Sequence, residues 1–197
     1  MARGPGSVRV IAGSMRGRRL TVPEGDLVRP TKDRVREAIF SALAARGAIA
    51  DALVLDLYAG SGALAIESLS RGADRALLVE KDRVALDAIA HNIEHLGLKS
   101  RTRVSRASVT TFLAGPPPAE APFDLVFADP PYDTPAGAVE ELLAALMVPG
   151  WLAPEAMISV ERPARAEIRP PEGLRACWER TFGDTLMFFF DASDRPT

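Results

Sequence analysis

The tetrapeptide Asp129-Pro130-Pro131-Tyr132 has the residue types best suited to chemistry, and it follows a short, nearly apolar segment over 123–128. Two consecutive prolines remove two backbone donors and fix two φ angles, so they hold the neighbouring carboxylate and phenol ring in place. If the apolar segment is a strand of an open α/β sheet, the tetrapeptide lies at the carboxyl edge, where such sheets bind ligands. A rigid acceptor beside a flat ring suits the binding of a nucleobase through its face and an exocyclic amino group.

A glycine-rich turn lies upstream, in Asp56-Leu57-Tyr58-Ala59-Gly60-Ser61-Gly62. Gly60 and Gly62 allow a ligand to approach the backbone, and a helix that follows such a turn offers free amide groups. Glu80 ends the next apolar segment, where an acid can accept hydrogen bonds from ribose hydroxyls. The spacing matches the dinucleotide fingerprint. Asp56, however, would repel a pyrophosphate and favour the cationic amino group of S-adenosylmethionine, so we expect S-adenosylmethionine as the cofactor.

The two motifs together suggest roles for the tetrapeptide. An exocyclic amine is a poor nucleophile, because its lone pair is delocalised into the base. Acceptors on both N–H groups would localise the lone pair and direct it at the sulfonium methyl group, and the Asp129 carboxylate and the Pro130 carbonyl are the candidates. Pro131 would stiffen the loop and Tyr132 would stack on the base. The protein would mainly supply proximity and alignment.

The elements that must position these motifs alternate between strand and helix, which predicts a parallel, doubly wound α/β sheet. The expected strands are 53–58, 75–80, 102–105, 123–128 and 157–161, and the expected helices are 63–70, 82–96, 108–114 and 137–147. Residues 174–181 and 185–191 predict a closing antiparallel hairpin. Near the amino terminus, 8–12 and 19–22 predict another hairpin, followed by a helix that starts near Lys32 with Thr31 as its cap.

Composition and charge indicate one globular domain that contacts a polyanion. Of the 197 residues, 47% are hydrophobic and 25% charged, which is ordinary for a soluble domain with at most a small extension. Residues 1–36 carry nine basic and three acidic side chains, whereas the remainder carries 15 basic and 23 acidic ones. A basic arm on an acidic body suggests that one end of the molecule contacts a polyanion.

The cysteine content and the apolar runs indicate the compartment of the protein. Cys177 is the single cysteine, which excludes an intrachain disulfide and fits a reducing compartment. No apolar run reaches the ~18 residues of a membrane span and no signal-peptide pattern is present, so we expect a cytoplasmic protein without membrane contact.

His91-Asn92-Ile93-Glu94-His95 matches an inverted zinc-protease signature. These are the only two histidines, and their helix should flank the sheet away from its carboxyl edge, so we expect no metal.

Several longer blocks spread over nearly the whole chain. They are Val10-Ile11-Ala12-Gly13-Ser14-Met15-Arg16-Gly17-Arg18-Arg19-Leu20, Arg29-Pro30-Thr31-Lys32-Asp33-Arg34-Val35-Arg36-Glu37, Leu55-Asp56-Leu57-Tyr58-Ala59-Gly60-Ser61-Gly62-Ala63-Leu64, Leu69-Ser70-Arg71-Gly72-Ala73, Asp129-Pro130-Pro131-Tyr132 and Phe182-Gly183-Asp184-Thr185. Together they resemble the bacterial RsmD family of class I methyltransferases. The glycine turn and the proline-rich tetrapeptide occur in many amino-methyltransferases, whereas the second block is much more specific.

The resemblance implies a Rossmann-like α/β fold: a seven-stranded, mostly parallel sheet with helices on both faces, a closing antiparallel hairpin and a small basic N-terminal β-hairpin extension. It implies methylation of N2 of one guanine in 16S ribosomal RNA of the small ribosomal subunit. Residues 1–30 would form the RNA-binding extension and residues 31–197 the methyltransferase domain. We expect a monomer.

The resemblance also implies the residues of each site. The cofactor site would include Asp56, Ala59, Gly60, Ser61, Gly62, Glu80, Ala107 and Ser108. Many relatives have Asp or Asn near the last pair, so here the adenine would meet backbone groups or Ser108. The candidates for phosphate contact are Arg16, Arg18, Arg19, Lys32 and Arg34.

Three other functions remain open from the residues themselves. The tetrapeptide Asp129-Pro130-Pro131-Tyr132 also fits an adenine-N6 methyltransferase that acts on DNA or RNA, and only the family resemblance favours guanine. A nicotinamide-dependent oxidoreductase would use the same glycine turn, but Asp56 argues against it. A non-catalytic RNA-binding module could retain the fold, but it would not need Asp129 or Gly60.

Overall fold

A seven-stranded sheet forms the centre of the computed structural model, which describes residues 7–23 and 30–192. Its strands are β3 (Leu53–Leu57), β4 (Arg75–Glu80), β5 (Thr102–Arg106), β6 (Phe123–Ala128), β7 (Leu152–Pro163), β8 (Arg175–Phe182) and β9 (Thr185–Asp191). They follow the order β5-β4-β3-β6-β7-β9-β8. The strands from β5 to β7 pair in parallel, and β9 pairs antiparallel with both β7 and β8. The predicted fold class, including the closing hairpin, is confirmed.

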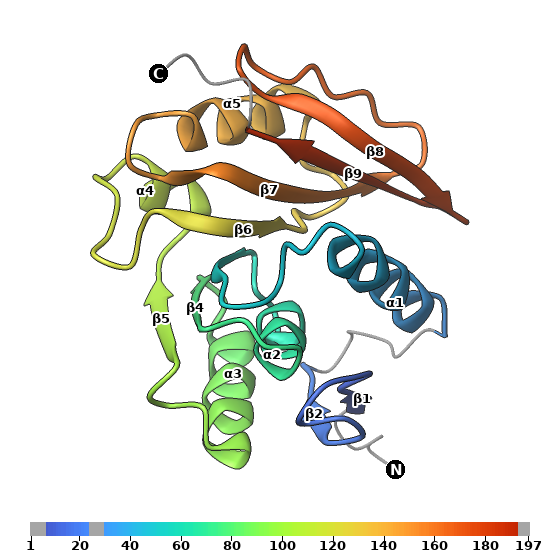
Figure 1. Ribbon diagram of the computed structural model, residues 1–197, viewed down its shortest axis with the longest axis vertical. Helices are drawn as coiled ribbons and strands as arrows, with labels where there is room; N and C mark the ends of the chain where they lie inside the picture. Colours follow the sequence, from blue (N-terminus) through green and yellow to red (C-terminus); the bar gives the residue numbers. More distant parts are fainter. Residues whose placement is uncertain (1–6, 24–29, 193–197) are drawn as a thin grey trace.

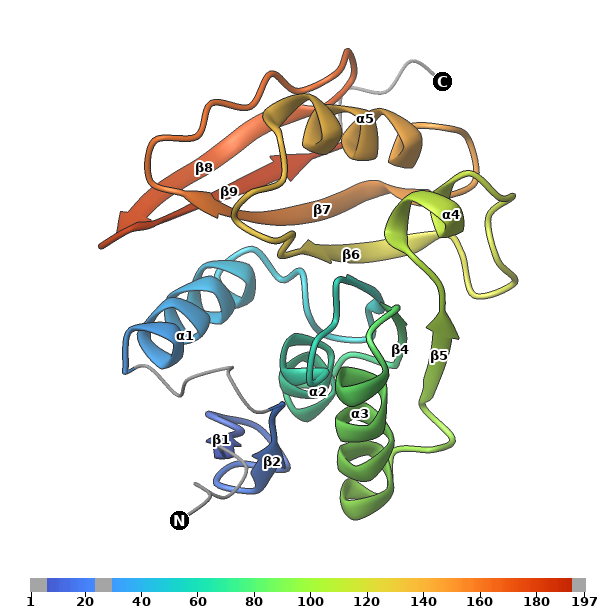
Figure 2. The same ribbon diagram turned by 180° about the vertical axis from the view of Figure 1, so that it is seen from behind.

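Helices cover both faces of the sheet. They are α1 (Pro30–Ala44), α2 (Ala63–Ser70), α3 (Arg83–Leu96), α4 (Val109–Leu113) and α5 (Ala136–Leu146). Figures 1 and 2 show α1, α2 and α3 on one side of the sheet and α4 and α5 on the other. Successive strand side chains point to opposite faces. In β3, Val54 therefore packs with α1 to α3 and Leu55 with α4 and α5.

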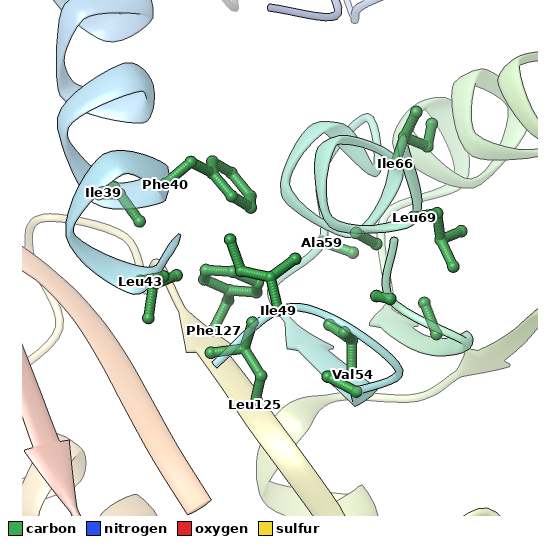
Figure 3. Close-up of a cluster of buried hydrophobic side chains, with 14 of the residues drawn as sticks. Ile39, Phe40, Leu43, Ile49, Val54, Ala59, Ile66, Leu69, Leu125 and Phe127 are labelled. Atoms are coloured by element: carbon green, nitrogen blue, oxygen red, sulfur yellow. The ribbon is translucent and has the colours of Figure 1, made fainter. Parts of the chain in front are cut away.

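Aromatic and branched side chains fix α1 against the sheet. Phe40 of α1 and Phe127 of β6 are both fully buried, with ring centroids 5.7 Å apart. Ile39 and Leu43 lie on the same face of α1, at helical spacing, and they point toward Leu125 of β6 in Figure 3. This packing holds the first turns of α1 beside the carboxyl edge of the sheet.

The amino-terminal segment forms a separate two-stranded hairpin. Its strands, β1 (Ser7–Arg9) and β2 (Arg19–Thr21), pair antiparallel, as predicted. The hairpin lies beside α2 (Figures 1 and 2). Val10 and Leu20 are buried and belong to the same apolar cluster as α1 and α2, so the hairpin packs on the body of the protein.

Three elements differ from the sequence-based expectation by more than one residue. The strand β1 ends at Arg9, whereas a strand over 8–12 was expected. The helix α1 begins at Pro30, so Thr31 lies inside the first turn instead of capping it. Proline is favoured at the first helical position, because a backbone N–H there has no hydrogen-bond partner within the helix. The strand β7 runs from Leu152 to Pro163, beyond the expected 157–161, because Leu152 pairs with Phe123 and Pro163 pairs with Thr185. Long-range pairing, which periodicity does not encode, extends it at both ends.

Candidate active site

A cavity of about 880 Å³ opens at the carboxyl ends of β3, β4, β6 and β7. The chain runs outward from β3 through β4 to β5 and then crosses back to β6 on the other side of β3, so the strand order reverses there. Ligands bind in the crevice at such a switch point. The turn after β3 and the loop after β6 both line the cavity. Val35 of α1 and Val22 of the hairpin segment line it as well.

The turn after β3 has an unusual backbone. Tyr58, Gly60 and Gly62 all have positive φ angles, of 62°, 55° and 77°. Gly62 is the N-cap of α2 and is the one predicted cofactor residue that does not line the cavity. A Cβ atom on Gly62 would lie 2.9 Å from Cδ2 of Leu78, so this glycine lets α2 pack closely against β4. Ala59, Gly60 and Ser61 line the cavity.

Glu80, at the end of β4, holds this turn in place. Its Oε2 accepts a hydrogen bond of 2.9 Å from the amide of Gly60, and its Oε1 accepts from the amides of Lys81 and Asp82. A carboxylate has about four lone-pair sites. Glu80 lines the cavity and can therefore accept further hydrogen bonds, such as those of ribose hydroxyls, while it fixes the turn.

Asp56 lies beneath the turn, with only 1% of its surface exposed. Its Oδ2 accepts a hydrogen bond of 3.0 Å from the amide of Ala65, in the first turn of α2. Burial raises the pKa of Asp56 to about 7; the Ala65 amide opposes this effect and the nearby Glu80 carboxylate adds to it. Asp56 lines the cavity, so a cationic ligand group placed there would stabilise the ionised carboxylate.

We expect cofactor affinity to increase as the pH rises from about 6 to about 7.5, because a cationic amino group binds the ionised Asp56 better than the protonated one. The α-amino group of the ligand stays mostly charged over this range, since such groups titrate near about 7.7–8.0. Calorimetric titration at pH ~6 in two buffers of different ionisation enthalpy should detect a released proton. Asp56→Asn, which keeps an acceptor for Ala65, should abolish both effects. An affinity of the native protein that does not change with pH would contradict the assignment.

The same pKa shift has a consequence for stability. The native state holds the Asp56 proton more tightly than the unfolded chain does, because the pKa rises from 3.8 to about 7 on folding. The ligand-free protein should therefore lose stability as the pH rises from about 4 to about 7, and Asp56→Asn should reduce this loss.

Ala107 and Ser108 line the cavity at the carboxyl end of β5. The Ser108 side chain caps α4: its Oγ accepts from the amide of Thr111 at 3.0 Å and donates to Thr111 Oγ1 at 2.7 Å. Since the helix α4 already uses this hydroxyl, backbone groups are the better candidates for contact with a bound adenine.

The acceptor loop, defined here as Asp129–Tyr132, follows the strand next to β3, and all four of its residues line the same cavity as the glycine turn. The amide of Thr134 donates to the carbonyl of Pro131 at 2.9 Å and closes a turn behind the two prolines. The buried Arg162 of β7 donates to the carbonyl of Thr134, so the loop is tied to the sheet. The structure thus brings these four residues into the same cavity as the glycine turn, and their roles in binding remain predictions.

Tyr132 is 49% exposed, but its hydroxyl is anchored. The hydroxyl lies 2.8 Å from Oγ1 of Thr185 in β9, and it donates to Oε1 of Glu161 in β7 at 3.2 Å. Burial raises the pKa of Tyr132, so the phenol keeps its proton at neutral pH. Glu161 and Thr185 both line the cavity, and neither was a candidate site residue. An acid that ends an apolar strand, as Glu80 does, was the signal that could have indicated Glu161.

Buried polar side chains dock the hairpin onto α2. Glu67 is 1% exposed and accepts from the amides of Ile11 and Ala12, at 2.7 and 3.0 Å. The hydroxyl of Ser70 donates to the carbonyl of Ala12 and accepts from the amide of Met15. The segment that follows β1 is thus held in a fixed position on α2.

Asn92 of α3 joins the hairpin to the glycine turn. Its Oδ1 accepts from the amide of Thr21 at 2.8 Å, and its Nδ2 donates to the carbonyls of Thr21 and Ser61, at 2.9 and 3.0 Å. The side chain is fully buried. The predictions identified none of these docking residues, because their partners are more than 30 residues away in the sequence.

Four of the five candidate phosphate-contacting residues lie outside the cavity. Arg16, Arg18, Arg19 and Arg34 are exposed, and the Lys32 side chain lies outside the described residues. Arg18 donates to the carbonyl of His95 at 2.9 Å, so it has a structural contact as well. These residues remain predictions as RNA contacts.

The described residues contain no group of three or more His, Cys, Asp or Glu side chains placed to hold a metal ion. In the zinc-protease-like segment, the rings of His91 and His95 stack on each other, and Glu94 pairs with Lys99 at 2.8 Å. Within residues 7–23 and 30–192, no helix combines the length and apolar character that crossing a membrane requires.

The strand order, with the glycine turn and the acceptor loop at one cavity, defines a protein with the class I methyltransferase fold. Comparison with known proteins agrees. The family described as "Conserved hypothetical protein 95" matches residues 8–191. A protein named "Ribosomal RNA small subunit methyltransferase D" from Escherichia coli is 44% identical over 158 residues, which cover 80% of this chain and 76% of the relative. A protein of the same name from Haemophilus influenzae is 36% identical over 90% of both chains.

Solved structures extend the comparison to the fold. The structure of yhhF from Escherichia coli superposes with a TM-score of 0.81 at 38% identity and covers 94% of this chain and 98% of that one. The chain therefore belongs to the family of ribosomal RNA small subunit methyltransferase D, the RsmD family, which confirms the resemblance seen in the sequence. This membership also confirms S-adenosylmethionine as the cofactor and argues against the nicotinamide-dependent oxidoreductase.

Proposed function

We propose that this protein transfers the methyl group of S-adenosylmethionine to the exocyclic N2 of a specific guanine in 16S ribosomal RNA of the small ribosomal subunit. The observation that carries the proposal is a single cavity that contains both the glycine turn with Asp56 and Glu80 and the acceptor loop. Relatives named for small-subunit ribosomal RNA methylation support the substrate.

The cofactor, when bound, supplies a methyl group that forms its bond to nitrogen as its bond to sulfur breaks, with the electron pair left on sulfur. The protein holds the nucleophile. Asp129 and the carbonyl of Pro130 accept hydrogen bonds from the two N–H groups and direct the nitrogen lone pair away from the ring. The surplus proton on nitrogen passes to the Asp129 carboxylate or to water. Tyr132, anchored at its hydroxyl, presents its ring to the base.

The proposal assigns binding of the polyanion to the basic extension. Residues 1–30, of which the structure describes 7–23 and 30, would contact RNA, and residues 31–197 would bind the cofactor and carry out the reaction. The target guanine would have to leave its stack to enter the cavity, as in other enzymes that modify bases. We propose that the protein acts in the cytoplasm as a monomer.

Methyl transfer to unmethylated small subunits tests the proposal directly. Tritiated S-adenosylmethionine should label one guanine at N2, which nuclease digestion and chromatography of the nucleosides would identify. Naked 16S RNA, assembled subunits and duplex DNA form the substrate series. Label on adenine, or on DNA alone, would favour the adenine-N6 alternative and overturn the proposal.

Charge reversal at Arg16 and Arg19 should weaken RNA binding and flatten its salt dependence. Each lost phosphate contact lowers the slope of log K against log[salt] by about 0.7–0.9, so the double variant should lose about 1.5 units of slope. Filter binding across a salt series measures this.

The double variant Arg75→Glu, Arg103→Glu is a control for the basic extension. It changes the net charge by the same amount as reversal at Arg16 and Arg19, but at arginines that already pair with Asp74 and Glu120. If both double variants gave the same slope of log K against log[salt], the basic extension would not be the RNA-contacting surface.

A further inference from the structure

Glu161 lies beside the acceptor loop at the carboxyl edge of the sheet. The register that pairs Ala128 of β6 with Val160 of β7 puts the next residues, Asp129 and Glu161, side by side on neighbouring strands. Adjacent strands are separated by about 4.8 Å, and both residues line the cavity. A base held at Asp129 therefore meets a second carboxylate one strand away.

The ring of Tyr132 lies in the same part of the cavity as the two carboxylates. Its hydroxyl donates to Oε1 of Glu161, and the charge of Asp129 also acts on it. A base that stacks on this ring would thus have one carboxylate at each of two positions along its edge. The hydrogen bond from Tyr132 occupies one of the roughly four lone-pair sites of Glu161 and orients the group.

The Watson–Crick edges of guanine and adenine differ in the way that such a pair of acceptors can detect. Guanine presents N–H donors on two adjacent ring positions, N1–H and the N2 amino group. Adenine presents an amino group beside N1, which carries a lone pair and no hydrogen. A carboxylate that faces N1 therefore gains a hydrogen bond with guanine and meets a lone pair with adenine. Sites that form such bonds reject analogues that lack the donor, because a buried polar group is then left unpaired.

We infer that Glu161 selects guanine by accepting a hydrogen bond from N1–H, while Asp129 and the Pro130 carbonyl hold the neighbouring amino group. This inference rests on the proposed function and supplies what the acceptor loop alone lacks, a group that distinguishes the two purines. Thr185 anchors Tyr132 independently, at 2.8 Å, so the ring keeps a fixed position when Glu161 is replaced.

The test compares guanine with 2-aminopurine at the target position of reconstituted small subunits. The analogue keeps the 2-amino group but has a bare N1. The native enzyme should prefer guanine by about 100-fold or more in kcat/KM. Glu161→Gln should narrow this preference by about tenfold, because its amide can donate to the bare N1. The analogue also lacks O6, but this loss lowers the rates of the native enzyme and of Glu161→Gln by the same factor, so it does not affect the difference between their preferences.

Glu179→Gln, at an exposed position of β8 outside the cavity, is the matched control and should keep the native preference. Calorimetric titration should give native cofactor affinity for both variants. A Glu161→Gln enzyme that is slower but keeps the native preference would overturn the inference, because a purely structural role changes the rate and not the ratio. A native enzyme that labels adenine would instead overturn the proposed function.

Discussion

Asp129→Ala is expected to lower the rate of methyl transfer by about 10²–10⁴-fold while cofactor affinity stays within a few-fold of the native value. Asp129 lines the cavity at the end of β6, where the two prolines hold it rigidly. Without its carboxylate the amino group loses one of its two acceptors, so the lone pair stays delocalised and is no longer aimed at the methyl group. Single-turnover assays at saturating cofactor measure the rate, and calorimetry measures the affinity.

Asp129→Asn provides the matched control for this prediction. It keeps an oxygen that can accept one N–H bond but loses the charge, so its rate should fall between those of the native enzyme and Asp129→Ala. An alanine variant with unchanged turnover would show that Asp129 does not hold the nucleophile. A loss of cofactor binding equal to the loss of rate would show instead that Asp129 acts on the cofactor.

Gly13→Ala should release the hairpin from α2. Gly13 has a φ of +81°, and a Cβ atom there would lie 1.8 Å from the carbonyl oxygen of Ser70. That oxygen accepts from the amide of Ser14 at 2.8 Å, so relief of the clash breaks the contact. The cost of the clash and the lost hydrogen bonds is about 2–4 kcal/mol, which lowers the melting temperature by roughly 5–15 °C.

Gly17→Ala separates the clash from the backbone strain. Gly17 has nearly the same φ, +80°, but a Cβ atom there meets nothing within 4 Å. It should therefore cost only the ~1 kcal/mol of a left-handed alanine. RNA affinity should fall at least about tenfold for Gly13→Ala and stay near native for Gly17→Ala. Similar melting temperatures and affinities for the two variants would show that the hairpin does not depend on this contact.

Much of the fold follows from local patterns in the sequence. The strands β4, β6 and β9 and the helix α2 have the predicted bounds, because apolar runs and helical periodicity are marked there by turn residues. The positions of Asp56, Glu80 and Asp129 at one edge also follow, since the carboxyl ends of parallel strands meet there. A cavity lined by both motifs could therefore be predicted from the sequence alone.

The contacts that complete the site depend on distant pairs and could not be predicted in this way. Glu67 and Asn92 look like ordinary polar positions on amphipathic helices, yet both are buried because the hairpin covers them. Glu161 ends an apolar run as Glu80 does, but its place beside Asp129 depends on the pairing of β7 with β6. Gly62 shows the opposite case: its motif suggested ligand contact, whereas its position beside Leu78 reflects helix packing.

The fully buried Asn92 binds both the hairpin and the glycine turn that lines the cavity, so the hairpin cannot be exchanged independently of the body of the protein. A graft of residues 7–23 onto another methyltransferase would leave the amides of Ile11 and Ala12 without Glu67, and both backbone groups of Thr21 without Asn92. A change of the RNA that this fold binds, made by exchanging the hairpin, therefore requires that Glu67 on α2 and Asn92 on α3 be exchanged together with it.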